Sequence, residues 1–255
     1  MVFYSDLKSF LDQQYKLYCT PSFIESDPVQ IPHLFKRKED IEIAGFLAAT
    51  IAWGQRKAII AGAKRLMNMM EHAPYDFVMN ATQHELKKLD AFVYRTFQPD
   101  DCLFFIYSLR NIYTNHGGLH NIFLEGYNSS GSVYGALSHF RRIFMETPHL
   151  PRSAKHVADV LRGASAKRLN MFLRWMVRKN DGIDFGIWKE IPASALMIPL
   201  DVHTGNVGRR LKLLVRRAND WKAVEELTGN LRKFDPVDPI KYDFALFGMG
   251  VYEAR

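Results

Sequence analysis

Residues 161–205 read LRGASAKRLNMFLRWMVRKNDGIDFGIWKEIPASALMIPLDVHTG, and this stretch decides how the rest of the chain is interpreted. A turn of small residues, 162–165, comes just before Lys167, which begins a helical pattern. Further on, the extended tripeptide 198–200 leads to Asp201 at the start of a second helical pattern, which is strongly basic. An amine and a carboxylate that each begin a helix and lie among positive charges suit chemistry on a nucleic-acid backbone.

Lys167 follows a turn between two helical segments that is suited to hold a phosphate. Backbone N–H groups at the start of a helix bind anions, and Gly163 can adopt the backbone angles that a tight turn requires. A desolvated lysine among other cations has a lowered pKa, which frees its amine to act as a nucleophile. The alternative interpretation is an exposed structural lysine, because most lysines are exposed.

Asp201 also has a structural and a chemical interpretation. Aspartate is a preferred N-cap, and most aspartates that precede a helix are explained by capping. Here an apolar-Pro-apolar tripeptide leads into the residue and holds the carboxylate rigidly, while the basic helix beyond keeps it ionised. Such a carboxylate can stabilise a cationic sugar transition state or take a proton from an incoming nucleophile.

The charge of the chain points to an anionic partner. The formal net charge is +7 and the isoelectric point is near 9.3, values that favour binding to polyanions. A helix is predicted over residues 202–214. The range 202–219 contains no acid and five cations, Arg209, Arg210, Lys212, Arg216 and Arg217. The basic excess therefore lies beside Asp201.

Helical periodicity dominates the chain and strand patterns are short, so the sequence predicts an all-α protein. Asp40 is expected to cap a helix through Ala52 that is apolar on nearly all sides, which is typical of a central core helix. The segment 20–38 contains three prolines and is expected to be a loop. We expect two helical lobes with a cleft, one of about 40–150 and one that combines 1–39 with 151–255.

Composition and cysteine content exclude several classes of protein. With 255 residues, 47% of them hydrophobic and 24% charged, the chain is typical of a globular protein. No apolar run reaches the roughly 18 residues of a membrane span, and no secretory signal is evident, so a cytoplasmic protein without a membrane partner is expected. Cys19 and Cys102 are too few for a four-cysteine zinc or iron–sulfur site. Asp201 and His203 have the D-x-H spacing of a pair of metal ligands, but no third ligand lies nearby in the sequence. We therefore expect neither a metal nor another cofactor.

Residues 161–172, LRGASAKRLNMF, resemble the helix-hairpin-helix element of the DNA glycosylase superfamily. In that element L-P-G-V-G is followed by one residue, a lysine and a helix, so Gly163 matches the first glycine and Lys167 the lysine of the bifunctional glycosylase/lyases. Residues 198–203, IPLDVH, are similar to the P-V-D-T-H motif of the superfamily, and Asp201 lies at its catalytic aspartate.

The resemblance extends to both ends of the chain in the order of the superfamily. Residues 45–55, GFLAATIAWGQ, resemble the apolar helix that places a glutamine, here Gln55, near the target-base pocket. Residues 242–251, YDFALFGMGV, are similar to its late helix with an A-L-x-x-x-G pattern. Over most of its length the chain also resembles an uncharacterised bacterial domain family related to these glycosylases.

The chain departs from the superfamily pattern at three points. Ser165 stands at the second glycine of the turn and Arg162 at its proline. Lys167 and Asp201 are 34 residues apart, further than in the common branches. No cysteine cluster follows, so the iron–sulfur cluster of some members is not expected.

The resemblance implies a base-excision repair glycosylase with AP lyase activity, acting on double-stranded DNA that carries a damaged base such as an oxidised purine. Lys167 would attack the sugar and Asp201 would assist. Gln55 would read the extruded base and Trp53 would stack on it, although Trp53 equally suits the end of a core helix. The residues expected to contact the DNA backbone are Gly163, Ser165, Arg168, Arg209, Arg210 and Lys212.

Two other functions remain open at the level of sequence. One is a non-catalytic nucleic-acid-binding protein on the same scaffold, with Lys167 as a phosphate contact, because a fold does not determine a function. The other is an enzyme that cleaves glycosidic bonds of free nucleosides or of RNA.

Overall fold

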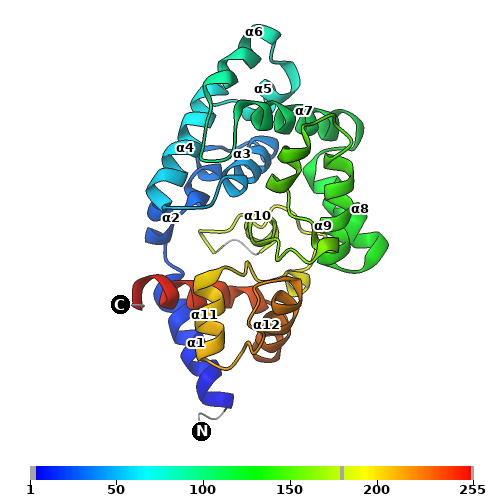
Figure 1. The fold of residues 1–255 in the computed structure, drawn as a ribbon. Helices are drawn as coiled ribbons and strands as arrows, with labels where there is room; N and C mark the ends of the chain where they lie inside the picture. Colours follow the sequence, from blue (N-terminus) through cyan, green and yellow to red (C-terminus); the bar gives the residue numbers. More distant parts are fainter. Residues whose placement is uncertain (1–3, 179–180, 254–255) are drawn as a thin grey trace. The chain divides into compact units, whose positions relative to one another are not determined.

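The computed structural model describes residues 4–178 and 181–253, and its regular secondary structure is helical (Figure 1). No strand occurs in these two ranges, where bridge pairing is limited to Tyr94 with Phe97 and Ala164 with Asp220. The prediction of an all-α protein is therefore confirmed. Among the helices of the described residues, none has the length and apolar character needed to cross a membrane.

Backbone contacts divide the chain into two compact units. The middle unit is Ser26–Asp159, and the terminal unit combines Met1–Glu25 with Val160–Arg255. Lys167 and Asp201 both belong to the terminal unit. The predicted base-pocket residues belong to the middle unit.

The middle unit consists of helices joined by short turns. Its α-helices are α3 (Lys38–Thr50), α4 (Arg56–Met69), α5 (Pro74–Asn80), α6 (Gln83–Leu86), α7 (Pro99–Asn115), α8 (Leu119–Ser130) and α9 (Val133–Phe144). Its 3₁₀ turns are η1 (Pro28–Gln30), η2 (Pro32–Leu34), η3 (Lys87–Ala91) and η4 (Pro151–His156).

Helix α3 is a buried core helix of the middle unit. Every residue from Ile41 to Thr50 is buried, as its apolar pattern predicts. The expected cap is wrong, because the N-cap of α3 is Arg37 and Asp40 lies within the first turn. The Oδ1 atom of Asp40 instead accepts a hydrogen bond from the backbone N–H of Tyr75 at 2.9 Å. This bond ties the start of α3 to the start of α5.

A cluster of phenylalanine rings joins α3 to α7 and α9. The Phe46 ring centroid lies 5.8 Å from that of Phe105, 5.5 Å from that of Phe140 and 5.5 Å from that of Phe144. All four side chains are buried. Burial of one such ring stabilises a fold by about 1.5–3 kcal/mol, and edge-to-face contacts between rings add to this.

Gly126 lets α8 approach α9 closely. A Cβ atom on Gly126 would lie 2.8 Å from the Cα of Ala136 and 2.7 Å from the Cβ of His139. The backbone of Ala136 cannot rotate away from a new methyl group as a flexible side chain could. We therefore expect Gly126→Ala to lower the free energy of unfolding by about 1–3 kcal/mol, the usual cost of overpacking. Urea unfolding measures this change.

Gly229, within α12 (Trp221–Phe234), provides the control for the glycine substitution. No atom lies within 4 Å of a Cβ placed on it. Gly229→Ala should therefore raise the stability by about 0.5–1 kcal/mol, because alanine favours a helix interior. Equal effects of the two substitutions would contradict the close approach of α8 and α9.

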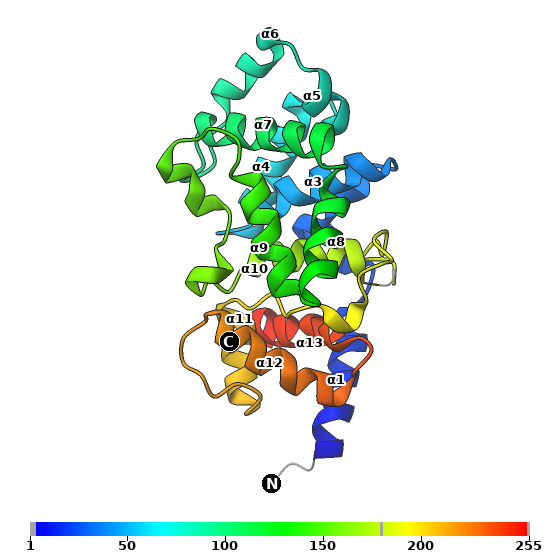
Figure 2. The same cartoon turned by 90° about the vertical axis from the view of Figure 1, so that its right-hand side faces the viewer.

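The terminal unit contains α1 (Tyr4–Tyr18), α10 (Lys167–Val177), α11 (Val202–Arg210), α12 and α13 (Tyr242–Gly248). Helix α13 packs against both α1 and α11 (Figure 2). Two glycines permit these contacts. A Cβ on Gly248 would lie 2.3 Å from the ring of Tyr18, and one on Gly250 would lie 2.8 Å from the Cβ of His203.

The segment 20–38 is not the loop that its prolines predict. It forms α2 (Ser22–Ser26) and the 3₁₀ turns η1 and η2. Pro28 and Pro32 each begin one of these turns, a position where the missing N–H has no consequence. The carboxylate of Asp27 caps η1, since it accepts a hydrogen bond from the N–H of Val29 at 2.9 Å.

Candidate functional site

Lys167 is the first residue of α10, and the turn before it is held in an unusual conformation. Gly163 has a φ of 83°, and Ala166, the N-cap, has a φ of 50°. A left-handed conformation costs a residue other than glycine about 1–2 kcal/mol. The side chain of Asn170 supports the turn, because its Nδ2 donates a hydrogen bond to the carbonyl of Ser165 at 3.1 Å. The start of α10 is thus fixed by the turn and by Asn170.

The same turn is attached to the start of α12. The backbone N–H of Trp221 donates to the carbonyl of Gly163 at 3.0 Å, and Ala164 pairs with Asp220 in an isolated bridge. The segment that leads into the turn is a 3₁₀ turn, η5 (Val160–Arg162), and not an α-helix. The position of Lys167 therefore depends on α12 as well as on α10.

Asp201 is the N-cap of α11. Its Oδ1 accepts a hydrogen bond from the N–H of Thr204 at 2.9 Å. The tripeptide that leads into it is buried, and the N–H of Ile198 donates to the Oγ1 of Thr228 on α12 at 3.1 Å. Capping uses one carboxylate oxygen, and the other is turned toward Lys167.

The amine of Lys167 and the carboxylate of Asp201 lie together. Their Nζ and Oδ2 atoms are 3.8 Å apart, and the two side chains are 26% and 21% exposed. This separation is that of an ion pair and is too long for a direct hydrogen bond. A partly exposed amine beside a carboxylate can serve as a nucleophile and its proton acceptor.

Asp243, in the first turn of α13, is a third ionisable group near this pair, and no sequence motif indicated it. The residue is 5% exposed, and its Oδ2 lies 2.5 Å from the Nη1 of Arg174. Burial raises the pKa of Asp243 to about 6, with Asp201 adding to the rise and Arg174 and Lys167 opposing it. Asp243 is therefore coupled to both charges of the Lys167–Asp201 pair.

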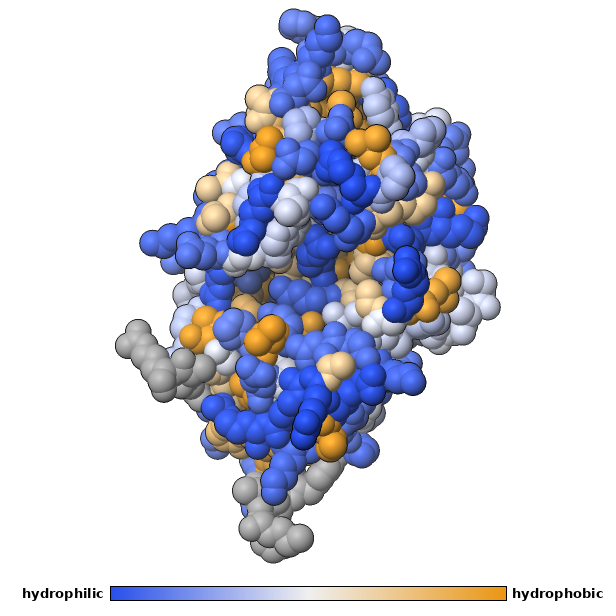
Figure 3. Space-filling view, viewed as in Figure 1, coloured by the Kyte–Doolittle hydropathy of each residue, from blue (hydrophilic) through white to orange (hydrophobic). Residues whose placement is uncertain are grey.

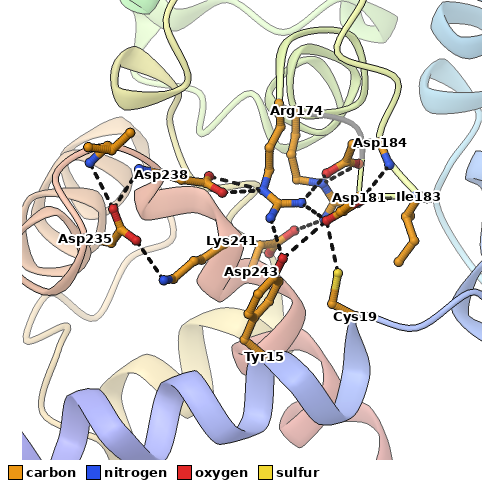
Figure 4. A network of polar contacts seen from close by, with 12 residues as sticks. Tyr15, Cys19, Arg174, Asp181, Ile183, Asp184, Asp235, Asp238, Lys241 and Asp243 are labelled. Carbon is orange, nitrogen blue, oxygen red and sulfur yellow. Dashed lines mark hydrogen bonds and ion pairs between the residues drawn. The ribbon is translucent and has the colours of Figure 1, made fainter.

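Arg174 also belongs to a network of buried charges (Figure 4). Its Nε donates to the Oδ1 of Asp184 at 3.3 Å. Arg178, one helical turn further on, donates to the Oδ2 of Asp184 at 3.0 Å and to the Oδ2 of Asp238 at 3.0 Å. Its Nη2 donates to the hydroxyl of Tyr15 on α1 at 2.8 Å. The network joins α10 and α1 to Asp184, which follows α10, and to Asp238, which precedes α13.

The basic segment after Asp201 is only partly helical, so the predicted basic helix is too long. Helix α11 ends at Arg210, and Lys212 has a φ of 60°. The N–H of Leu213 donates to the carbonyl of Gly208 at 2.8 Å, and the N–H of Lys212 donates to the carbonyl of Arg209 at 3.0 Å. This pair of bonds is a Schellman motif, which turns the chain out of the helix.

The side chain of Arg209 is hydrogen-bonded to the segment between α11 and α12. Its Nε donates to the carbonyl of Arg216 at 2.9 Å, and its Nη2 donates to the carbonyl of Arg217 at 2.8 Å and to the Oδ1 of Asn219 at 2.6 Å. Arg216 in turn forms an ion pair with Asp220. These arginines hold the segment between α11 and α12 in place.

The other cations expected at the DNA backbone differ in exposure. Arg210 and Lys212 are exposed. Arg168 is the second residue of α10, and burial lowers the pKa of Arg168 to about 10, so its guanidinium stays charged at neutral pH. Gly163 and Ser165 are half-buried. On the face drawn in Figure 3, the surface over α11 and the chain that follows it is mostly hydrophilic.

Trp53 and Gln55 lie where α3 ends and α4 begins, in the middle unit. Trp53 is half-buried, and its ring centroid lies 5.9 Å from that of His156 and 5.4 Å from that of Tyr94. The Trp53 carbonyl also accepts a hydrogen bond from the Tyr94 hydroxyl at 2.8 Å. Gln55 is the N-cap of α4, and its exposed side chain makes no capping bond. Trp53 therefore packs against Tyr94 and His156 with part of its surface exposed, and Gln55 is accessible.

Arg95 lies over the turn that links these two residues. Gly54 has a φ of 103°, and a Cβ on it would lie 2.2 Å from the Nη1 of Arg95. Arg95 is exposed and itself has a φ of 55°. An arginine distant in the sequence thus joins Trp53 and Gln55 on the surface of the middle unit.

His203 and the cysteines take structural positions. The Nδ1 of His203 is 3.0 Å from the carbonyl of Gly250, and the Sγ of Cys19 donates to the Oδ2 of Asp181 at 3.1 Å. Cys102 is buried. Among residues 4–178 and 181–253, no group of three histidine, cysteine, aspartate or glutamate side chains could hold a metal ion.

The profile of one protein family, described as "Protein of unknown function (DUF2400)", matches residues 27–252. The match covers most of the chain, and the chain therefore belongs to this family. Lys167, Asp201 and Asp243 all lie within the matched range. No curated protein and no solved structure matches the chain.

Proposed function

We propose that this DUF2400 protein is a DNA base-excision enzyme: a glycosylase with AP lyase activity that acts on a damaged base such as an oxidised purine. The 3.8 Å separation between the Lys167 amine and the Asp201 carboxylate carries the proposal. These two residues are the ones that the resemblance to helix-hairpin-helix glycosylases assigns to catalysis. We also propose that the two units of the chain correspond to the two lobes of those enzymes.

The proposed reaction begins when Asp201 accepts a proton from the Lys167 ammonium. The free Nζ then forms a bond to C1′ of the sugar while the bond from C1′ to the base nitrogen breaks, and the base leaves with the proton that Asp201 had accepted. A second proton passes from Nζ, by way of Asp201, to O4′ as the C1′–O4′ bond breaks. The product is a Schiff base between Lys167 and the opened sugar, and the carboxylate stabilises positive charge on the sugar during the transfer.

We propose double-stranded DNA as the partner of this site. The N-terminus of α10 has no side-chain cap, so its backbone N–H groups can bind a phosphate oxygen. The exposed side chains of Arg210 and Lys212 add phosphate contacts. The proposal assigns Gln55 and Trp53 to the extruded base, by hydrogen bonding and by stacking.

One observation favours a second candidate function, a non-catalytic nucleic-acid-binding protein on the same scaffold. The Nζ of Lys167 lies 3.8 Å from the Oδ2 of Asp201, the separation of an ion pair between an ammonium and a carboxylate. An ammonium group binds phosphate well but is not a nucleophile. In this case Lys167 is a backbone contact, and the DNA keeps its base.

Borohydride trapping distinguishes the two functions. Wild-type protein is incubated with duplex oligonucleotides that contain 8-oxoguanine or an abasic site, in the presence of sodium borohydride. We expect a covalent protein–DNA adduct, because borohydride reduces a Schiff base to a stable amine. Lys167→Arg should abolish the adduct while it retains the positive charge for binding, because the arginine side chain does not supply the nucleophilic amine.

The control is Lys222→Arg, which changes an exposed lysine of α12 and should leave trapping unchanged. An adduct that persists in Lys167→Arg would show that another residue is the nucleophile. Binding of the duplex by wild-type protein, with neither base release nor an adduct, would establish the second function instead.

A further inference from the structure

The turn of the middle unit that carries Arg95 is strained. Tyr94 and Phe97 pair through two backbone hydrogen bonds of 2.9 Å, so that Arg95 and Thr96 form a two-residue turn between them. Arg95 is the first residue of this turn and has a φ of 55°, where glycine is usually found. A left-handed conformation is unfavourable for a residue with a Cβ atom. Strain of this kind persists only where the surroundings impose it, and it is concentrated at binding sites.

Three contacts fix this turn against α4 and the residues before it. The hydroxyl of Tyr94 donates a hydrogen bond to the carbonyl of Trp53 at 2.8 Å. The ring of Tyr94 packs on Gly62 of α4, where a Cβ atom would lie 2.8 Å from it. The guanidinium of Arg65, also on α4, donates a hydrogen bond to the carbonyl of Val93. The turn is therefore anchored on both sides, and the exposed side chain of its first residue starts from a fixed backbone.

The exposed face of α4 beside this turn is basic. Lys57 and Lys64 are both exposed and lie seven residues apart, which is about 10 Å along the helix axis. The guanidinium of Arg95 lies over Gly54, just before α4 begins. Residues 43–70 contain no acid. We call Lys57, Lys64 and Arg95 the basic surface of the middle unit.

The three cations of the basic surface have no carboxylate partner in the described part of the chain. Other exposed cations of the middle unit do have one. Arg37 pairs with Glu39 at 3.0 Å, and Lys88 pairs with Glu71 at 2.7 Å. Positive charge on the basic surface is therefore not neutralised within the fold and is open to an anionic partner.

We propose that the basic surface binds the phosphate backbone of double-stranded DNA, with Arg95 as a phosphate contact that the strained turn holds in place. Cations spaced along a helix neutralise several phosphates of one strand and release their counterions, and a guanidinium can bind two phosphate oxygens at once. Trp53 and Gln55, which the proposed function assigns to the extruded base, flank the glycine under Arg95. The inference rests on the proposed function for its partner, DNA, but not for any step of the reaction.

Fluorescence anisotropy of a labelled, undamaged duplex measures this contact when it is repeated over a range of salt concentrations. In Arg95→Gly we expect binding to be about tenfold weaker, as for the loss of a hydrogen bond to a charged group. The slope of log K against log salt concentration should become smaller by about 0.9, the value for one phosphate. In the double variant Lys57→Gln/Lys64→Gln the slope should become smaller by about 1.8. These changes should be equal on duplexes of different sequence, because phosphates carry no sequence information.

Two further variants separate a lost contact from a damaged fold. Arg95→Gly should unfold at a temperature no lower than that of wild type, because glycine adopts a positive φ without strain. Arg95→Lys keeps the charge and should keep the salt slope, since lysine also binds phosphate. The matched control is His72→Gly. His72 is exposed in the same unit and also has a φ of 55°, so this substitution relieves the same strain and should leave DNA binding unchanged.

The salt slopes decide the proposal. Slopes equal to that of wild type in both Arg95→Gly and the double lysine variant would overturn it, and would favour an acidic protein as the partner of this surface. Weaker binding that is confined to duplexes with a damaged base would also contradict it, because Arg95 would then contact the base. If Arg95→Gly unfolds more readily than wild type, the double lysine variant, which leaves the turn intact, gives the answer.

Failure of this proposal and failure of the proposed function give different results. If the variants show the expected salt slopes but wild-type protein forms no borohydride adduct, the basic surface binds DNA and the proposed enzyme is excluded. If wild-type protein forms the adduct and the variants bind DNA as wild type does, the enzyme is supported and the basic surface is not its DNA contact. A wild-type protein that binds no duplex would exclude both.

Discussion

Arg178→Met is expected to lower the free energy of unfolding of the terminal unit by about 3–5 kcal/mol, the usual cost of removing one partner from a buried ion pair. The side chain of Arg178 is 3% exposed and that of Asp184 is fully buried. Burial by itself would lower the pKa of Arg178, but Asp184, Asp238 and Asp181 raise it. Without the guanidinium, Asp184 would keep its bond to Arg174, whereas the partly exposed side chains of Asp181 and Asp238 would lose their arginine partner.

The same substitution should change the acid stability. Burial opposes ionisation of Asp181, yet Arg178, together with hydrogen bonds from Cys19 and Ile183, holds the pKa of Asp181 at about 2, below its ordinary value of 3.8. A carboxyl with a lowered pKa in the fold stabilises the protein above pH ~4, and this contribution is lost as the pH falls toward ~2. In Arg178→Met that part of the pH dependence should become smaller, because only the hydrogen bonds from Cys19 and Ile183 remain to lower the pKa of Asp181.

Urea unfolding at neutral and acid pH measures both effects. The matched control is Arg142→Met, because Arg142 is 63% exposed and pairs with Glu146 across one helical turn at 3.5 Å. An exposed pair of this kind contributes about 0–1 kcal/mol. If Arg178→Met costs no more than Arg142→Met, the network is not a major source of stability.

The features that the sequence predicted correctly have local causes. Helix α3 is apolar on nearly all sides, and such a pattern has only one stable place, inside the core. Asp201 follows an apolar-Pro-apolar lead-in and precedes a helix, the position of an N-cap, and the carboxylate does cap α11. Lys167 begins α10 after a turn in which Gly163 has a positive φ, a conformation that glycine adopts without strain.

The features that the sequence did not predict depend on partners distant along the chain. Asp243 appears in the sequence only as one acid in an apolar run, and its importance comes from Arg174, 69 residues earlier. The sequence does not indicate the end of α11, because the left-handed position of its Schellman motif is occupied by Lys212 and not by glycine, the usual signal. The sequence predicts Arg209 to be a surface cation, but its guanidinium is bonded to the carbonyls of residues 216 and 217, a contact that no local pattern indicates.

Asp201 is expected to show the second large effect, and two substitutions separate its two roles. Asp201→Asn keeps an oxygen that can accept the hydrogen bond from the N–H of Thr204, since asparagine caps a helix about as well as aspartate. Asp201→Ala removes the cap and should cost about 1 kcal/mol of stability. If the carboxylate takes the proton of Lys167, both variants should release a damaged base about 10²–10⁴-fold more slowly, the usual contribution of a general base.

Single-turnover base release from an 8-oxoguanine duplex, compared with thermal unfolding, tests this expectation. Ser132→Ala is the control for lost capping, because Ser132 caps α9 through the N–H of Gly135 at 3.1 Å and lies in the middle unit. It should lose a similar amount of stability and retain base release. Because only the charge distinguishes Asp201→Asn from wild type at this cap, slow release in both Asp201 variants would assign the effect to the carboxylate. Slow release in Asp201→Ala alone would mean that Asp201 acts only by holding α11.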